Sequence, residues 1–175
     1  SVFTLQWSDP VGASANDYDL FVVDSSLTNV VASSETDQTG TQNPFEIVSA
    51  SGYYFGYYLV IVKVSGDARY LHLNTNRGRL GVSTSGQTWG HSGAESAFSV
   101  AAVDIHDAAG PGDTFNGTEQ MEYFSSDGPR KVFYEANGTA ITPVNFSSTG
   151  GETRQKPDLA AADGVSCRTP NFSTF

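Results

Sequence analysis

The first half of the chain alternates apolar and polar residues over short stretches, which is the pattern of half-buried β-strands. These stretches are separated by turn residues and polar loops, and they cover residues 2–7, 18–24, 29–32, 45–48, 57–64, 70–73 and 79–82. The most apolar of them, 57–64, is rich in β-branched and aromatic residues and is predicted to be a central strand. No segment of helical length shows a 3.6-residue period. We therefore predict a mainly β fold, with a β-sandwich or jelly roll over residues 1–88.

The pattern changes from about residue 88 onward. The continuous apolar run 97–105 is bounded by glycine and acidic residues, which is typical of a strand buried on both faces of an α/β sheet. Residues 107–117 and 138–151 are rich in Gly, Pro, Thr and Asn and are predicted to be loops. Between them, an Asn-Gly pair predicts a short hairpin across Asn137-Gly138. Residues 89–175 are thus expected to form a separate, loop-rich partial α/β segment without a core of its own.

Charge and cysteine content exclude several classes of partner. Nine basic residues against nineteen acidic ones give a net charge of −10, which argues against binding to nucleic acid or to an anionic membrane surface. The single cysteine, Cys167, excludes an internal disulfide framework and a multi-cysteine metal site. Any bound metal would therefore be held mainly by oxygen. No apolar run approaches the roughly 20 residues that a membrane-spanning helix requires.

One acidic cluster has the potential to bind a metal ion. Asp17 and Asp19 are two residues apart on a predicted strand, so their side chains should share a face. Asp9 and Asp24 lie nearby in the sequence, and a loop carboxylate such as Asp9 could complete an oxygen site for calcium. The alternative is that these carboxylates form turns, cap loops and keep an edge strand from aggregating.

An aromatic cluster surrounds Gly52 and Gly56 and permits two interpretations. Its members are Tyr53, Tyr54, Phe55, Tyr57 and Tyr58. Packing into the core at the start of the following strand is the interpretation we favour. The other is an exposed platform for sugars or for an extended peptide.

Four segments in the second half carry a family resemblance. They occur in this order: Gly90-His91-Ser92-Gly93, residues 97–104, residues 124–130 beginning Phe-Ser-Ser, and residues 156–166 beginning Lys-Pro-Asp. Together they resemble the C-terminal part of a subtilisin-like serine protease. The resemblance implies that Gly90, His91 and Ser92 help to form the substrate pocket of the intact enzyme. It also implies that Lys156, Pro157 and Asp158 pack beneath the active site.

The same resemblance predicts that this chain carries no catalytic residue. The nucleophilic serine of the family lies in a Gly-Thr-Ser motif, and no such motif occurs in this sequence. The Asp and His of the family's triad are not recognisable either. The chain is therefore expected to be an inert piece of a secreted, bacterial serine endopeptidase. Its expected partners are the remainder of the protease chain and a protein or peptide substrate, with a homodimer as a further possibility for the isolated piece.

The first half resembles the β-sandwich accessory domains of secreted bacterial proteases, the pre-peptidase C-terminal type among them. The resemblance is carried by a strand ending in Trp7, an acidic strand from Asp17 to Asp24, and the run Val31-Ala32-Ser33. It implies a domain inserted ahead of the substrate-pocket segment, where it assists substrate binding or stability. Two alternatives remain open: a carbohydrate- or protein-binding module, and a purely structural insert stabilised by calcium.

Overall fold

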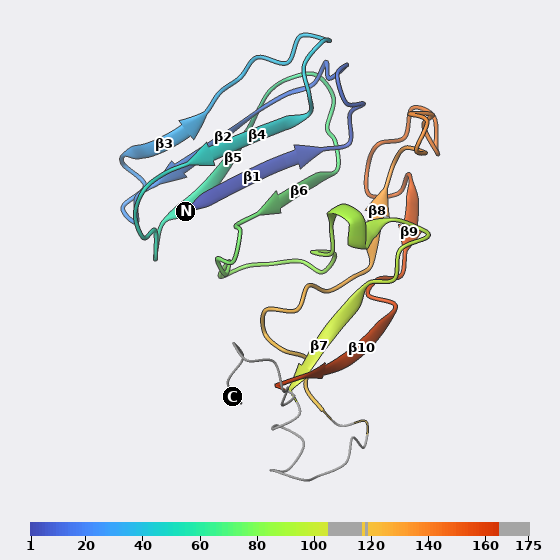
Figure 1. Cartoon of the computed structure of the whole chain (residues 1–175). Helices are drawn as coiled ribbons and strands as arrows, with labels where there is room; N and C mark the ends of the chain where they lie inside the picture. Colours follow the sequence, from blue (N-terminus) through green and yellow to red (C-terminus); the bar gives the residue numbers. More distant parts are fainter. Residues whose placement is uncertain (105–116, 118, 165–175) are drawn as a thin grey trace, which may run out of the picture. The chain divides into compact units, whose positions relative to one another are not determined.

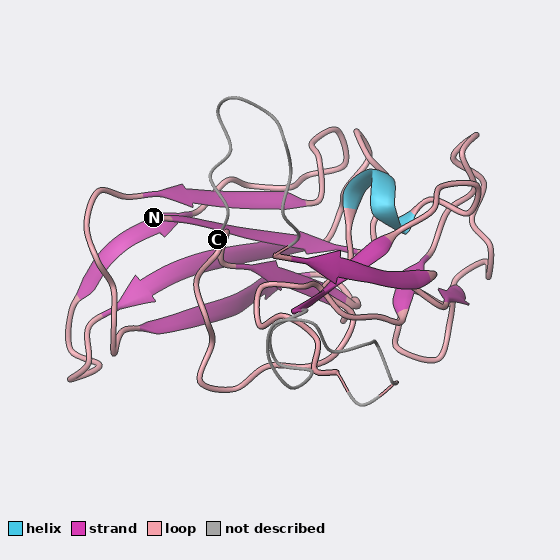
Figure 2. Ribbon diagram, turned by 60° about the horizontal axis from the view of Figure 1, so that its bottom comes forward, coloured by secondary structure: helices cyan, strands magenta, loops and turns pink. Residues whose placement is uncertain are grey.

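The computed structural model describes residues 1–104, 117 and 119–164. Its regular structure within those ranges consists of β-strands and one short 3₁₀ helix, η1, at Gly90–Gly93 (Figures 1 and 2). The strands are β1 (Val2–Trp7), β2 (Asp17–Val23), β3 (Val30–Ser34), β4 (Phe45–Ser49), β5 (Tyr58–Ser65), β6 (Leu71–Asn74), β7 (Val100–Asp104), β8 (Arg130–Val132), β9 (Glu152–Arg154) and β10 (Leu159–Asp163). The prediction of a mainly β fold is confirmed. No helix in the described ranges is long and apolar enough to cross a membrane.

The chain divides into two compact units. The first, which we call the sandwich unit, comprises Ser1–Ser83 together with Val132–Glu152. The second, which we call the pocket unit, comprises Thr84–Lys131 together with the residues from Thr153 onward. The sequence predicted a division after residue 88, five positions from the observed boundary after Ser83. It did not predict that residues 132–152 belong to the sandwich unit.

Two antiparallel three-stranded sheets form the sandwich unit, in the orders β4-β1-β6 and β3-β2-β5 (Figure 1). Alternate residues of β1 and β2 point inward, because successive side chains of a strand lie on opposite faces. The buried core comes from both sheets and consists of Phe3, Leu5, Trp7, Tyr18, Leu20, Val22 and Val48. Partly buried residues of β5 and β6 pack against it.

The strand predicted to be central lies at a sheet edge. β5 pairs with β2 on one side and ends the order β3-β2-β5, so the prediction for 57–64 was wrong in its position. The apolar, β-branched composition of this segment correctly indicates a strand but does not determine which strands lie beside it. The predicted strand over 79–82 was also wrong, since these residues form bends and irregular structure.

The aromatic cluster before β5 is only partly in the core. Tyr54 packs against the core beside Phe3, with ring centroids 5.8 Å apart in an edge-on arrangement. Tyr53 and Phe55 are 99% and 100% exposed, so core packing, the interpretation favoured from the sequence, was wrong for these two residues.

In the pocket unit, β7 and β10 pair in parallel, with Leu159 opposite Val100 and Asp163 opposite Asp104. Burial on both faces of this strand was predicted and was wrong: Ala101 and Val103 are buried, whereas Val100 is 55% exposed. The described part of the second half contains no α-helix that could cover the second face. The predicted loop over 107–117 lies almost wholly outside the described residues, as do Cys167 and the rest of 165–175.

The hairpin across Asn137-Gly138 is confirmed. Its two arms meet at an isolated antiparallel bridge between Tyr134 and Ala140, and the Ile141 N–H donates to the Phe133 carbonyl at 3.0 Å. Gly138 adopts a φ of +84°, the left-handed conformation that this turn requires and that glycine adopts without strain.

Candidate functional site

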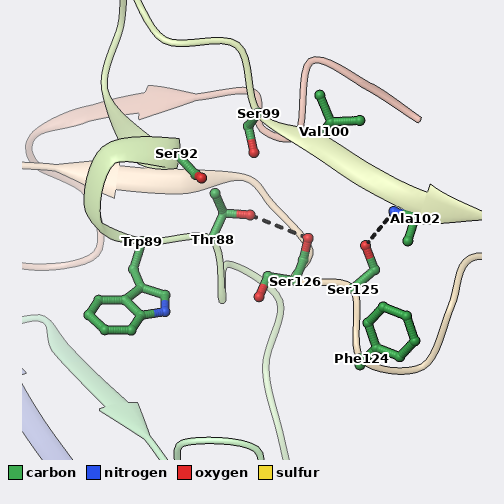
Figure 3. A pocket seen from close by; sticks show the side chains of 9 residues that line it. All are labelled: Thr88, Trp89, Ser92, Ser99, Val100, Ala102, Phe124, Ser125 and Ser126. Carbon is green, nitrogen blue, oxygen red and sulfur yellow. Dashed lines mark hydrogen bonds between the residues drawn. The ribbon is translucent and has the colours of Figure 1, made fainter. Parts of the chain in front are cut away.

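A pocket of about 290 Å³ opens in the pocket unit (Figure 3). Three stretches of chain line it: the residues leading into η1 together with Ser92 of η1, the start of β7, and the turn that follows residue 123. Its lining residues are Thr88, Trp89, Ser92, Ser99, Val100, Ala102, Phe124, Ser125 and Ser126. The pocket is therefore built from segments that are separated in the sequence and brought together by the fold.

Two hydrogen bonds to the backbone of Ala102 attach β7 to Glu122 and to the Phe-Ser-Ser turn that follows it. The Ala102 N–H donates to Ser125 Oγ at 3.0 Å, and the Ala102 carbonyl accepts from the Glu122 N–H at 2.9 Å. Ala102 lies mid-strand, so both of its backbone groups on this side are satisfied by the turn. This pairing fixes the position of Phe124 and Ser125 at the pocket (Figure 3).

The opposite wall is held by Thr88, which is almost completely buried. Its N–H and its Oγ1 both donate to the Asp127 carbonyl at 2.8 Å. The Asp127 carboxylate in turn accepts from the N–H groups of Gly86 and Gln87, at 3.0 and 3.1 Å. The residues before Trp89 are thus fastened to the same turn from the other side.

A buried lysine fastens β10 to the approach to β7. Lys156 Nζ donates to the Ala97 carbonyl at 2.6 Å and lies 2.8 Å from Asp158 Oδ2. Asp158 also accepts from the Ser99 N–H at 2.7 Å. The hydrogen bond from Lys156 and then that from Ser99 lower the pKa of the Asp158 carboxyl. The Lys-Pro-Asp segment therefore positions Ser99, which lines the pocket.

The pocket surface is neutral. None of its nine lining residues carries an ionisable side chain, and five of them carry hydroxyl groups. The rings of Trp89 and Phe124 stand on opposite sides of those hydroxyls in Figure 3. Such a surface can bind an uncharged or apolar group by ring contact and hydrogen bonds. It contains no base that could activate a hydroxyl as a nucleophile.

The structure separates the three residues that the family resemblance assigned to the substrate pocket. Ser92 lines the pocket, whereas Gly90 and His91 belong to the same 3₁₀ turn but are exposed outside the lining. The remaining lining residues were not assigned to a pocket from the sequence. The Phe-Ser-Ser signal at 124–126 was visible there, but its neighbour in space, Thr88, carries no local signal.

The four aspartates proposed as calcium ligands do not form one coordination group. Among the described residues there is no set of three or more His, Cys, Asp or Glu side chains that could hold a metal ion. Asp24 instead closes the turn after β2: Asn29, then the Thr28 N–H and Ser26, hydrogen-bond its carboxylate and lower its pKa. Calcium binding stays a prediction, which a rise in melting temperature on adding calcium to chelator-treated protein would support.

Asp9 forms an ion pair with Arg69. Its Oδ1 lies 2.7 Å from Arg69 Nε and its Oδ2 accepts from Ser14 Oγ at 2.9 Å. Burial alone would raise the pKa of Asp9, but hydrogen bonds from Arg69, Asn16 and Ser14 outweigh it and the pKa is lowered. Because both carboxylate oxygens of Asp9 already accept these hydrogen bonds, they are not available to bind a metal ion together with Asp17 and Asp19.

Asp17 and Asp19 lie close together on β2. Asp17 is buried and accepts from the Gln38 N–H at 3.3 Å. The pKa of Asp19 is raised, first by partial burial and then by the negative charges of Asp17, Glu35, Glu46 and Asp37. This end of the sandwich unit is therefore a region of carboxylate repulsion.

Comparison with protein-family models, with curated proteins and with solved structures found no match. The function of the chain must therefore be inferred from its own residues.

Proposed function

We propose that this chain is part of a subtilisin-like serine endopeptidase, in which the pocket unit contributes to substrate binding and the sandwich unit is an accessory domain. One observation carries the proposal. The four segments that resemble the family gather in the pocket unit: the first three each contribute residues to the pocket, and the fourth pairs in parallel with the second. Segments matched separately in the sequence thus form one site.

The chemistry of the pocket supports a role in binding polypeptide substrate. Its hydroxyl groups and the exposed rings of Trp89 and Phe124 suit an uncharged or apolar side chain. An acyl-transfer reaction also needs a nucleophile, a base and donors for the oxyanion. The proposal assigns these to another part of the protease, so this chain alone binds but does not hydrolyse. Secretion from a bacterium is part of the proposal and rests on the family resemblance.

The test uses the protein expressed from its complete reading frame. We expect it to hydrolyse a fluorogenic peptide and to be labelled by a serine-directed fluorophosphonate, whereas the 175-residue chain does neither. Ser126 is exposed and lines the pocket, so Ser126→Phe should fill the pocket and raise KM for a bulky apolar substrate about tenfold. Ser83→Phe, at another exposed serine, should leave KM unchanged. A full-length protein that is neither labelled nor active would refute the proposal.

A second candidate function is that of an extracellular binding module. It is favoured by the complete exposure of Tyr53 and Phe55, because large apolar rings that no described residue covers commonly mark an interaction site. The sandwich unit would perform this function whether or not the pocket unit belongs to a protease.

A further inference from the structure

The outer edge of β5 is open. β5 pairs with β2 on one side, and no described strand pairs with it on the other. Within the described part of the chain, the backbone of residues 58–65 makes no hydrogen bond to any segment other than β2. A row of unpaired N–H and C=O groups on an edge strand is a template for another strand. With eight residues, β5 is also the longest strand in the described ranges.

Little protects this edge. Proteins usually block an open edge with charged residues, proline, a bulge or a very short strand. β5 carries one charged residue, Lys63. Its pairing with β2 has one register shift, between Asp17 and Tyr18 of β2, and both features lie near the C-terminal end of β5. The stretch Tyr58–Val62 carries no such feature.

Exposed apolar side chains accompany the edge. Tyr58, Val60, Val62 and Val64 alternate along β5 and are between 37% and 53% exposed. On β2, Val23 lies opposite Tyr58 and Phe21 lies opposite Val60, and both are partly exposed. A strand added at this edge would find backbone partners and an apolar stripe for every second side chain.

The aromatic loop leads directly into this edge. Tyr53 and Phe55 are fully exposed, while Tyr54 between them is anchored by Phe3, by Tyr57 with ring centroids 5.3 Å apart, and by its hydroxyl on the Ser51 carbonyl at 3.0 Å. A backbone bond from Tyr57 N–H to the Tyr54 carbonyl closes the loop at 3.2 Å. The contacts of Tyr54 therefore anchor the backbone that carries the two exposed rings, which lowers the entropy lost when a partner binds.

Charge selects among the possible occupants. From residue 47 to residue 62 the chain has no charged residue, although its net charge is −10. Two copies of so acidic a chain repel one another, which disfavours a second copy at this edge. The loop composition of Tyr, Ser and Gly is that of surfaces that recognise polypeptides through aromatic contact and adaptable hydrogen bonds. An unpaired strand edge adds a regular row of backbone donors and acceptors, and its spacing matches the backbone of another extended polypeptide.

We propose that the sandwich unit binds an extended, apolar polypeptide segment without acidic residues, which adds as a strand to the outer edge of β5 and contacts Tyr53 and Phe55 at the end near Tyr58. This inference rests on the second candidate function and specifies its ligand. It does not involve the pocket.

The experiment measures binding of a fluorescein-labelled eight-residue peptide of alternating valine and threonine to the 175-residue chain, by fluorescence anisotropy. Its matched twin is N-methylated at two consecutive central residues, which blocks both edges because successive N–H groups of a strand point in opposite directions. We expect the twin to bind at least about tenfold more weakly. No binding of the unmodified peptide at millimolar concentration, or equal binding of the two, overturns the proposal.

Three variants locate the site, and circular dichroism and melting temperature establish that each is folded. Val60→Lys with Val62→Lys introduces the charges that protect natural edge strands and should weaken peptide binding about tenfold. Tyr53→Ser with Phe55→Ser should weaken it severalfold. Ile47→Lys, at a similarly exposed residue of the other sheet, is the control and should bind as the wild type does.

Other occupants would give different results. A dimer in sedimentation velocity that the Val60→Lys and Val62→Lys changes dissociate would assign the edge to a second copy and overturn the proposal. Retention on an insoluble polysaccharide that is lost only with the Tyr53→Ser and Phe55→Ser changes would assign the loop to a glycan. In that case strand addition fails, while the binding-module function stands.

Discussion

The ion pair between Asp9 and Arg69 is predicted to be a principal stabilising contact of the sandwich unit. Asp9 is buried, and its side chain is only 3% exposed. Arg69, which lies 60 positions away in the sequence, donates from Nε at 2.7 Å. Asp9→Asn keeps the shape of the side chain but removes the charge that balances the guanidinium. It also turns a group that accepts from Asn16 and Ser14 into one that accepts fewer hydrogen bonds.

The magnitude follows from burial. Two opposite unit charges about 4 Å apart attract by about 4 kcal/mol at an effective dielectric constant near 20, and desolvation offsets much of this. Removing one partner of a buried pair leaves the other uncompensated and typically costs about 3–5 kcal/mol. Arg69 also has a second acidic neighbour, Asp67, at 3.6 Å, whose side chain is 85% exposed. An exposed pair contributes about 0–1 kcal/mol, so Asp67→Asn is the matched control.

The assay is urea unfolding followed by tryptophan fluorescence in a Trp89→Phe background. Trp7 is then the only reporter, and its indole N–H donates to Ser14 Oγ at 3.0 Å within the same network. We expect Asp9→Asn to lower the free energy of unfolding by about 3–5 kcal/mol and Asp67→Asn by less than about 1 kcal/mol. Equal losses in the two variants would show that burial does not determine the strength of these pairs.

Three further predictions concern charge and packing. The pKa of Asp9 is lowered in the folded state, so the ionised carboxylate stabilises the fold fully above the unfolded pKa of about 3.9 and progressively less as the pH falls below it. The difference in urea midpoint between wild type and Asp9→Asn should therefore shrink from pH 4 to pH 2.5. The pKa of Asp19 is raised in the folded state, so its ionised carboxylate destabilises the folded protein at neutral pH. Asp19→Asn should therefore stabilise the protein by about 0.5 kcal/mol at pH 7 and not at pH 3. A Cβ at Gly128 would collide with the Lys156 carbonyl, so Gly128→Ala should destabilise the pocket unit by about 1–3 kcal/mol, measured by thermal melts. Gly81→Ala is the control, because its Cβ meets open space, and it should have almost no effect.

The features predictable from the sequence are those that depend on neighbouring residues. The two-residue period of β1 predicts both the strand and its inward face, because Phe3, Leu5 and Trp7 are buried together. The Asn137-Gly138 turn is likewise predictable, since its backbone conformation is favoured by these residue types. Local composition determines these features whatever the rest of the chain does.

The features that were missed depend on distant residues. The edge position of β5 follows from the strands beside it, which its own composition does not specify. The proposed role of Asp9 as a calcium ligand omitted Arg69, because a partner so far along the chain leaves no local signal. The same holds for the pocket, where Thr88 is fastened to Asp127 by the tertiary fold. Exposure of Tyr53 and Phe55 was the interpretation not favoured from the sequence, since aromatic residues are usually buried.

The negative charge of the chain gives a final prediction for the edge of β5. Residues 47–62 carry no charge, but the chain as a whole has a net charge of −10. We therefore expect the long-range field of the protein to repel an acidic ligand even though this stretch contains no acidic residue. We expect the valine-threonine peptide to bind with little dependence on salt, and a valine-aspartate peptide to bind more weakly at low salt. The Debye length falls from about 10 Å at 0.1 M to about 3 Å at 1 M, so the difference between the two should narrow as salt is added. A difference that does not change with salt would mean that shape or hydrogen bonding, and not the field of the acidic chain, excludes the acidic peptide.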